Sequence, residues 1–487
     1  MLFNTVEFIV FFAVVLALIV IIKNRKYQHI FLLASSYFFF YFSSNYLVVL
    51  LFSSALLDFY IAKEIWKSKN ILHKKLLLII SLAGNLGLLG FFKYADFAIM
   101  QFNILGNYFD LSNEITLLNL ALPIGISFYT FQTIGYTVDV YRNQLQPSKS
   151  FREFALYVSF FPQLVAGPII RAKDFLPQLR EKIENVNSKQ ILRKIIIDNS
   201  NFKLGITIMA FGFFKKIFFA DNLAPFVNEI FNYPMGLDSF AIITATLAFG
   251  IQIYADFSGY SDIAIGAALI LGFKIPKNFN KPYFAISPTD FWKRWHISLS
   301  SWLKDYLYIP LGGNKKSSTR TYTNLIIVMF LGGLWHGASW NFVVWGLLHG
   351  FYLAIHKLLK NKVGTPKFFQ NKFGKIIAIL ITQYFVFLAW IPFRVHDTEF
   401  MLYSIQKYIF IDFDIFDAIE FIQFNKFTFG IIGLFFILQL FSYRKPLFVL
   451  SISKLKLRYW TIVLTVLFMA VIFFSGAQSS DFIYFRF

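Results

Sequence analysis

The chain has 487 residues, of which 57% are hydrophobic and only 15% charged, and its mean hydropathy is +0.59. A water-soluble chain of this length could not bury so much apolar surface, so the composition excludes an ordinary soluble enzyme. The formal charge of +20 does not predict nucleic-acid binding, because the basic residues form short blocks beside apolar segments, as in cytoplasmic loops. The absence of cysteine excludes disulfides, thiolate catalysis and cysteine-ligated metal.

Apolar segments long enough to cross about 30 Å of hydrocarbon occur along the whole chain. Residues 5–22 have no basic region before them and no small-residue cleavage site after them, so we expect this segment to stay as a span. Residues 28–62 are too long for one span, and a turn near Asn45 would make them a helical pair. Further spans are expected at residues 76–92, 117–137, 203–220, 239–255, 337–355, 376–393, 428–441 and 460–475.

Two segments do not have the pattern of simple spans. Residues 154–170 are apolar but contain Pro162, Gly167 and Pro168, and residues 256–345 mix aromatic, glycine and charged residues. Irregular backbone at membrane depth is tolerated only where protein buries it or where it lines a cavity. We therefore expect a protein-enclosed cavity.

The basic blocks predict the orientation of the chain in the membrane. The segments expected on the cytoplasmic side are 23–26, 63–75, 142–152, 171–194, 274–320, 357–375 and 444–458. The loops 94–116, 221–238 and 395–427 are richer in acids and are expected outside, as are both termini. Since no soluble domain is apparent, we expect a single integral membrane domain over residues 1–487.

One of the seven histidines, His336, has the surroundings of an active-site base. Glycines on both sides of it permit close backbone approach, and Trp335 and Trp340 wall the position. An ionisable residue within a membrane segment is a functional candidate, and an imidazole suits general-base catalysis. The alternative is a core histidine satisfied by a neighbouring group.

A second candidate, His296, lies in residues 291–306, where the spacing predicts one helix with a stripe of tryptophans that includes Trp295. His296, Lys293 and Arg294 lie beside this stripe. One interpretation is an interfacial helix with cations that extend toward water. The other is the floor of a site that receives an anionic cofactor from the cytoplasm, and the two are compatible.

Other polar residues near apolar segments leave several roles open. His349 lies on an apolar helix and is either a helix–helix hydrogen-bonding residue or part of a site. Asp256 and Asp262 are costly in a membrane unless paired, and could position a histidine or pair with Arg294 or Arg171. The sequence has no phosphate-binding loop and no serine-hydrolase elbow, so ATP-driven transport and serine hydrolysis lack support.

Six motifs between residues 121 and 350 occur in a fixed order: PIGISFYTFQ (123–132), FPQLVAGPI (161–169), DFSGYSD (256–262), FWKRWH (291–296), YIPLGG (308–313) and GLWHG (333–337). With them the chain resembles the membrane-bound O-acyltransferase (MBOAT) family, and in particular its bacterial alginate and peptidoglycan O-acetyltransferases. The ending DFIYFRF, in the C-terminal region 376–487 of spans and external tail, also resembles this branch.

The resemblance implies an all-α polytopic protein with about 10–12 transmembrane helices, plus re-entrant and amphipathic helices, in a ring around a funnel. The family's invariant histidine falls on His336, and its second, more variable polar position falls on His296. Such proteins move an acyl group from a cytoplasmic donor to an extracytoplasmic partner with an SGNH-hydrolase-type fold. The partner then O-acetylates a cell-surface polysaccharide, for which we favour peptidoglycan over alginate or another exopolysaccharide.

The basic cytoplasmic face favours a phosphorylated donor such as acetyl-CoA, for which Lys293, Arg294 and Trp295 are the candidate binding residues. Beyond that donor we expect no bound cofactor and no metal, and a location in the bacterial inner membrane, in contact with lipid. The alternatives are D-alanyl transfer to teichoic acid, a transporter or polyprenol-lipid flippase, and a structural scaffold. The clustered polar residues and the absence of internal repeats weigh against the last two.

Tyr484 is the third catalytic candidate. The donor is expected on the cytoplasmic side of the membrane and the partner on the external side. A thioester exposed to water would be hydrolysed, so a short-lived tyrosyl ester is a sensible carrier of the acyl group. The predicted orientation puts Tyr484 outside, and its phenol, with a pKa near 10, would need a base such as His336. The alternative is that these aromatic residues are an interfacial belt that anchors the last span.

Overall fold

The structure is a computed structural model that describes residues 1, 3–110, 114–164, 167–182, 190–364, 366–475 and 482–483. Within these residues the protein is almost entirely helical, as predicted, with two strands of three residues each. The chain divides into two compact units: unit 1 comprises Met1–Ile206 and Ala264–Pro276, and unit 2 comprises Thr207–Ile263 and Lys277–Phe487. The division does not test the expected single membrane domain, which stays a prediction.

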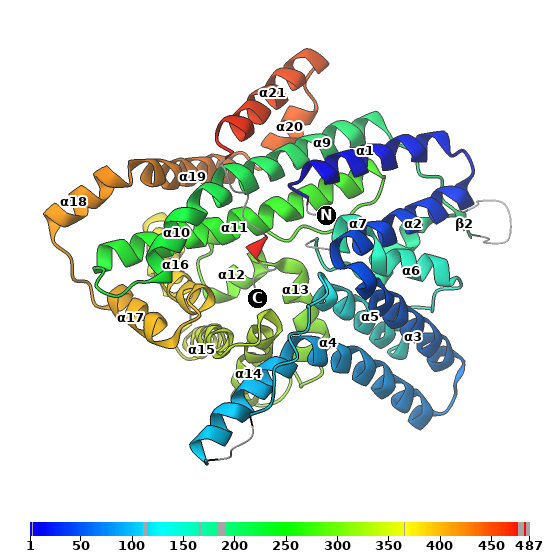
Figure 1. Cartoon of the computed structure of the whole chain (residues 1–487), viewed down its shortest axis with the longest axis horizontal. Coiled ribbons are helices and arrows are strands. Elements are labelled where there is room, and N and C mark those ends of the chain that lie inside the picture. The colour runs from blue at the N-terminus through cyan, green and yellow to red at the C-terminus, as the bar shows by residue number, and fades with distance from the viewer. Residues whose placement is uncertain are drawn as a thin grey trace. The chain divides into compact units, whose positions relative to one another are not determined.

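Unit 1 is formed by the N-terminal helices (Figure 1). Its elements are α1 (Val6–Ile21), α2 (Arg25–Ser44), η1 (Asn45–Leu47), α3 (Val48–Lys67), α4 (Ile71–Tyr108), α5 (Ile126–Tyr141), α6 (Phe151–Ser159), α7 (Phe161–Leu164), α8 (Ala172–Phe175), η2 (Leu176–Leu179), β1 (Arg180–Lys182) and β2 (Gln190–Leu192). The two strands pair antiparallel. Helix α5 packs against α3 and α4, and α6 packs against α2 and α3.

The break between α2 and α3 confirms the predicted helical pair. Asn45 has a φ of 50°, in the left-handed region, which asparagine tolerates better than most residues. The predicted span 117–137 is wrong in its first half, because residues 114–123 form no helix. Polar side chains of α4 bond to that backbone instead: Asn103 bonds to both backbone groups of Ile115, and Asp96 accepts from the amide of Leu118.

A buried carboxylate joins three helices of unit 1. Asp58 of α3 is fully buried and accepts hydrogen bonds from Ser81 and Asn85 of α4 and from Thr137 of α5. In a membrane the hydrophobic effect does not drive helices together, because lipid tails are as apolar as the helix surfaces, so interhelical hydrogen bonds of this kind contribute to helix association. Asp58 therefore fixes the mutual register of α3, α4 and α5.

Unit 2 contains the helices that hold the candidate site (Figure 1). Its elements are α9 (Asn199–Phe213) and α11 (Ser239–Ile270), which both also extend into unit 1, with the π-helix η3 (Phe214–Asp221), α10 (Asn222–Asn232), η4 (Pro282–Phe284), α12 (Pro288–Arg294), α13 (Ile297–Leu303), the π-helix η5 (Lys304–Tyr308), α14 (Ser318–His336), α15 (Trp340–Val363), η6 (Lys367–Gln370), α16 (Lys372–Arg394), α17 (Thr398–Ile409), α18 (Ile415–Phe424), α19 (Lys426–Arg444), α20 (Phe448–Ser453) and α21 (Leu457–Phe473).

Six helical segments of the described residues are long and apolar enough to cross a membrane: Arg25–Lys67, Ile71–Tyr108, Ser239–Ile270, Trp340–Val363, Lys372–Arg394 and Lys426–Arg444. Two further apolar helices, α1 and α21, are shorter. Some other predicted segments are divided: residues 154–170 contain the short helices α6 and α7, and residues 203–220 contain the end of α9 and most of η3. The protein is thus a multi-pass membrane protein.

Candidate active site

His336 is the last residue of α14 and is only 5% exposed. Its imidazole lies against three aromatic rings, with centroid distances of 5.0 Å to Trp335, 4.9 Å to Trp345 and 5.2 Å to Phe393. These rings come from α14, α15 and α16. A tryptophan-walled position, as predicted from the sequence, is therefore formed. Trp345, which was not predicted, provides one wall, and the predicted Trp340 is 58% exposed.

The close pairing of α14 and α15 depends on Gly333. A Cβ atom on Gly333 would collide with the backbone oxygen of Phe342 and lie 3.1 Å from the Cα atom of Gly346. Both neighbours are backbone atoms of α15, so they cannot move aside as a flexible side chain can. Gly333 thus sets the distance between the helix that ends in His336 and the helix that holds Trp345.

We expect Gly333→Ala to destabilise the protein by roughly 1–3 kcal/mol, the usual cost of overpacking, and to lower its thermal unfolding midpoint in detergent. Gly332→Ala is the matched control. A Cβ atom on Gly332 would meet only the side chain of Leu303, at an ordinary 3.5 Å, so this variant should unfold at or slightly above the wild-type temperature. Equal midpoints for the two variants would contradict the steric argument.

His296 lies between α12 and α13, and the predicted continuous helix over residues 291–306 is wrong at this point. His296 has φ 41° and ψ 56°, a left-handed conformation. The segment 278–280 pairs with the chain here: Asn280 donates to the oxygen of Arg294, and Ile297 donates to the oxygen of Asn278. These non-local bonds replace helical ones and turn the backbone at His296.

The His296 side chain is fully buried, with its ring centroid 4.6 Å from Phe257 and 6.1 Å from Trp335. It lies outside the candidate membrane spans, and burial lowers its pKa to about 3. The imidazole is therefore neutral near pH 7. Because Trp335 contacts both His296 and His336, the two predicted histidines belong to one aromatic cluster of unit 2.

His349 belongs to the same cluster. Its ring lies 4.9 Å from Trp345 and 5.1 Å from Trp292, and is stacked on Phe291 at 6.0 Å. Its Nε2 atom has no hydrogen-bond partner among the described residues, so this atom does not make the helix–helix hydrogen bond that was one of the two predicted roles. Trp345 contacts both His336 and His349. The sequence does not indicate this arrangement, because it depends on the packing of α14 against α15.

The three predicted donor-binding residues have different environments. Lys293 is exposed, and Arg294 is partly buried and forms an ion pair with Asp290 at 2.9 Å. Trp295 is 2% exposed and packs against Phe291 at 5.5 Å. The two cations are accessible to an anionic ligand, whereas Trp295 is part of the core.

The two aspartates of α11 pair with lysines that the sequence did not suggest. Asp256 lies 2.9 Å from Nζ of Lys216, and Asp262 lies 2.5 Å from Nζ of Lys215. The two lysines are consecutive residues of η3, and the wider turn of a π-helix changes the directions of successive side chains relative to an α-helix. The expectation that these aspartates form ion pairs is confirmed, but among the described residues their partners are these two lysines and not the predicted Arg294 or Arg171.

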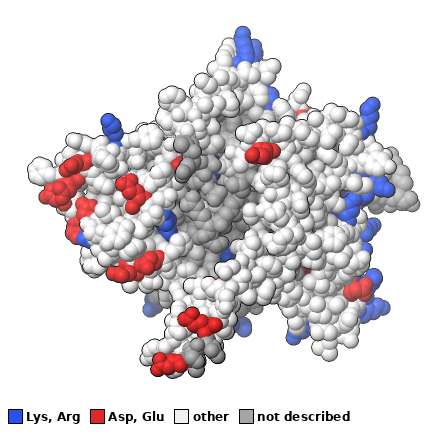
Figure 2. Space-filling model, in the orientation of Figure 1, with Lys and Arg blue, Asp and Glu red and all other residues white. Residues whose placement is uncertain are grey.

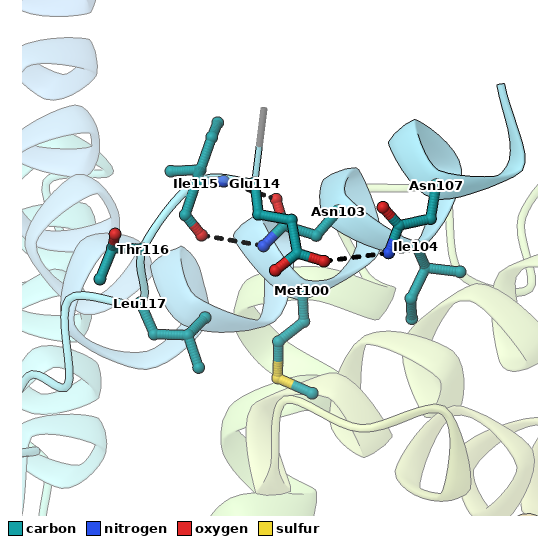
Figure 3. A pocket seen from close by; sticks show the side chains of 8 residues that line it. All are labelled: Met100, Asn103, Ile104, Asn107, Glu114, Ile115, Thr116 and Leu117. Atoms are coloured by element: carbon teal, nitrogen blue, oxygen red, sulfur yellow. Dashed lines mark hydrogen bonds between the residues drawn. The ribbon is translucent and has the colours of Figure 1, made fainter. Parts of the chain in front are cut away.

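Tyr484 lies outside the described residues. The two residues before it are described: Phe482 is fully buried, and the amide of Ile483 donates to Asp256 at 2.7 Å. A pocket of about 510 Å³ occurs elsewhere, in unit 1, between the end of α4 and residues 114–117 (Figure 3). None of the predicted site residues lines it, and the described residues contain no cluster of His, Asp or Glu side chains that could hold a metal ion.

The fold and the buried histidine cluster define a class: a multi-pass helical membrane protein whose candidate catalytic side chains lie in its interior. The sequence model of the MBOAT, membrane-bound O-acyltransferase, family matches residues 140–406. This match covers more than half of the chain and includes both His296 and His336. The chain belongs to this family, as the motifs predict, and is an O-acyltransferase.

Similar proteins include bacterial acetyltransferases. The chain is 40% identical over 370 residues to the peptidoglycan O-acetyltransferase of Helicobacter pylori, covering 71% of this chain and 67% of that protein. It is 40% identical over 322 residues to a probable alginate O-acetylase of Azotobacter vinelandii, covering 66% and 60% of the two chains, so it spans about three fifths of that relative. A teichoic acid D-alanyltransferase of Streptococcus thermophilus is 28% identical over 291 residues, covering 55% of this chain and 68% of that protein.

Proposed function

We propose that the protein is an O-acetyltransferase of the bacterial inner membrane, which moves an acetyl group from cytoplasmic acetyl-CoA to an extracytoplasmic partner of SGNH-hydrolase type. The partner then O-acetylates a cell-surface polysaccharide, with peptidoglycan favoured. The observation that supports acetyl transfer is the 40% identity to peptidoglycan and alginate acetyltransferases, against 28% to a D-alanyltransferase. D-alanyl transfer is the second candidate, because those relatives share the same family.

In the proposed reaction, His336 acts as the general base. It removes the phenolic proton of Tyr484 while the phenolic oxygen attacks the thioester carbonyl carbon. The carbon–sulfur bond breaks, the thiolate leaves and takes up a proton, and a tyrosyl acetate ester remains. A serine of the partner then accepts the acetyl group and the phenol is restored. The aromatic rings around His336 support this role because they exclude water, which would hydrolyse the thioester.

The proposed direction of transfer depends on the orientation of the chain. Figure 2 shows acidic side chains gathered over the part of unit 2 that contains α17 and α18. Asp397 and Asp414 cap these two helices, and Glu399 and Asp417 lie in their first turns. Acidic loops are poor in the lysine and arginine that retain a loop in the cytoplasm, so we place α17 and α18 on the external side, with both termini.

Lys293 and Arg294 are proposed to bind the phosphates of the donor from the cytoplasmic side, with His296 helping to orient it. Lys293→Gln should raise the apparent KM for acetyl-CoA by roughly threefold to fivefold, the upper part of the range for one exposed charge contact, with a smaller change in kcat. Arg294→Gln should do the same and also break the ion pair with Asp290. Initial rates measured in inside-out vesicles check both expectations.

Lys315, which is exposed in the same basic segment, provides the control for the donor site. Lys315→Gln removes the same charge from the cytoplasmic surface but not from the proposed site, and its KM should stay within about twofold of the wild type. Equal increases for Lys293→Gln and Lys315→Gln would contradict a local binding site and indicate a general surface potential.

The experiment that tests the function is a measurement of ester-linked groups on isolated wall polymers from cells with and without the gene. Loss of ester-linked acetate on deletion, restored by the wild-type gene, would support acetyl transfer. Loss of ester-linked D-alanine instead would support the second candidate. Unchanged levels of both esters would contradict O-acyl transfer to the wall.

A further inference from the structure

We propose that the buried carboxylate of Asp256 is a positioning residue that docks the C-terminal segment of the chain beside the histidine cluster. The consequence for acyl transfer depends on the function proposed above, but the docking itself does not. The contacts of Asp256, Lys216, Phe482 and Ile483 support it, and all four residues belong to unit 2.

Asp256 and Asp221 both form ion pairs with Lys216. Lys216 is fully buried, and its Nζ atom lies 2.8 Å from Asp221 and 2.9 Å from Asp256. A buried carboxylate is costly unless donors satisfy its oxygens. Oδ1 of Asp256 faces Lys216, and its other oxygen, Oδ2, accepts the hydrogen bond from the backbone amide of Ile483. The C-terminal segment therefore supplies a donor to the second oxygen of a buried carboxylate whose first oxygen faces Lys216.

Apolar contacts hold the same segment. The ring of Phe482 is fully buried, 4.4 Å from that of Tyr260 and 5.8 Å from that of Phe257. Ile483 is 5% exposed and belongs to the main hydrophobic core of unit 2. The segment is therefore held by one charge-assisted hydrogen bond and by the burial of two apolar side chains, and both contributions would be lost if the segment left this site.

The docking site is adjacent to the candidate active site. Asp256, which bonds to the C-terminal segment, is followed in α11 by Phe257, whose ring lies 4.6 Å from His296. One stretch of α11 thus contacts both the C-terminal segment and the histidine cluster. Tyr484, the residue that we propose as the acyl carrier, directly follows Ile483 in the sequence, so the bond to Asp256 holds the residue before the proposed carrier.

Asp262 provides a matched control on the same helix. It belongs to the same DFSGYSD motif and also pairs with a lysine of η3, but its partner is Lys215 and its side chain is 32% exposed. Removing Asp262 also breaks an aspartate–lysine pair between α11 and η3. It leaves the bond between Asp256 and Ile483 in place, so the two variants separate docking from a general loss of ion pairing.

Hydrogen–deuterium exchange of the full-length protein in nanodiscs, followed in the C-terminal peptide, tests the docking. Asp256→Ala should raise the exchange rate of the amides of Phe482 and Ile483 at least about tenfold, the loss expected for one charge-assisted hydrogen bond. Asp262→Ala should change it less than about twofold. Unchanged exchange in a folded Asp256→Ala protein would overturn the proposal.

Ile483→Pro tests the same bond without altering the buried charges, in case Asp256→Ala does not fold. Proline removes the backbone donor, so the amide of Phe482 should exchange at least about tenfold faster, whereas Ile483→Val keeps the donor and should stay close to the wild type. Equal exchange in these two variants would overturn the proposal.

Acetylation assays of the same variants separate this inference from the proposed function. Faster exchange together with lost acetylation supports both. Faster exchange with wild-type acetylation supports docking but contradicts the carrier role of the C-terminal segment, so failure of one proposal is not mistaken for failure of the other.

Discussion

Replacing His336 with alanine is expected to abolish polymer acetylation, with a decrease of roughly 10²–10⁴-fold, the usual contribution of a general base. The imidazole at the end of α14 packs against the rings of Trp335, Trp345 and Phe393, which cannot accept a proton in its place. Packing around it should largely survive, so the amount of protein in the membrane and its melting temperature should stay close to those of the wild type. Ester-linked acetate on isolated polymers is the measurement.

His356→Ala is the matched control for this experiment. His356 is on the neighbouring helix α15, but it is only half-buried and bonds to Thr289 outside the aromatic cluster. Its acetylation level should stay within about twofold of the wild type. Normal acetylation by His336→Ala would rule out His336 as the base.

Tyr484→Phe is expected to lower polymer acetylation by at least about 100-fold, because it removes the phenolic oxygen that forms the ester in the proposed relay. The substitution keeps the aromatic ring, so an interfacial belt that anchors the last span would be preserved. Membrane levels should therefore be unchanged. Acetate on isolated polymers and the amount of protein in the membrane are measured in the same cells.

Tyr459→Phe separates the relay from a general effect of losing a tyrosine hydroxyl near a membrane surface. Tyr459 lies at the start of α21 and is 48% exposed, and its variant should acetylate normally. Full activity of Tyr484→Phe would leave only the anchoring role for the C-terminal aromatic residues.

Local signals in the sequence were sufficient to predict several features. Continuous apolar segments predicted the helical membrane fold, and Asn45 marked the break between α2 and α3. The ordered motifs predicted the family, and the residues around His336 predicted a buried, tryptophan-walled histidine. Each of these follows from residues that are close together in the sequence, where composition and spacing determine the structure directly.

Features that depend on distant residues could not be predicted. The turn at His296 is imposed by pairing with residues 278–280, and no local pattern indicates it. The partner of Asp256 lies 40 residues earlier and that of Asp262 lies 47 residues earlier, both in a π-helix. The i→i+5 hydrogen bonding of a π-helix has no sequence signature of its own. The bond from Ile483 to Asp256 joins residues 227 positions apart.

The left-handed backbone at His296 restricts which amino acids can replace it. Glycine and asparagine adopt this conformation at little cost, whereas β-branched residues do so at a cost on the order of 1–3 kcal/mol. Substitution tolerance at position 296 is thus set by backbone shape as well as by the chemistry of the side chain. His296→Asn is the informative replacement, since it removes the imidazole while keeping a residue type that accepts the turn, whereas a valine scan would measure strain and loss of chemistry together.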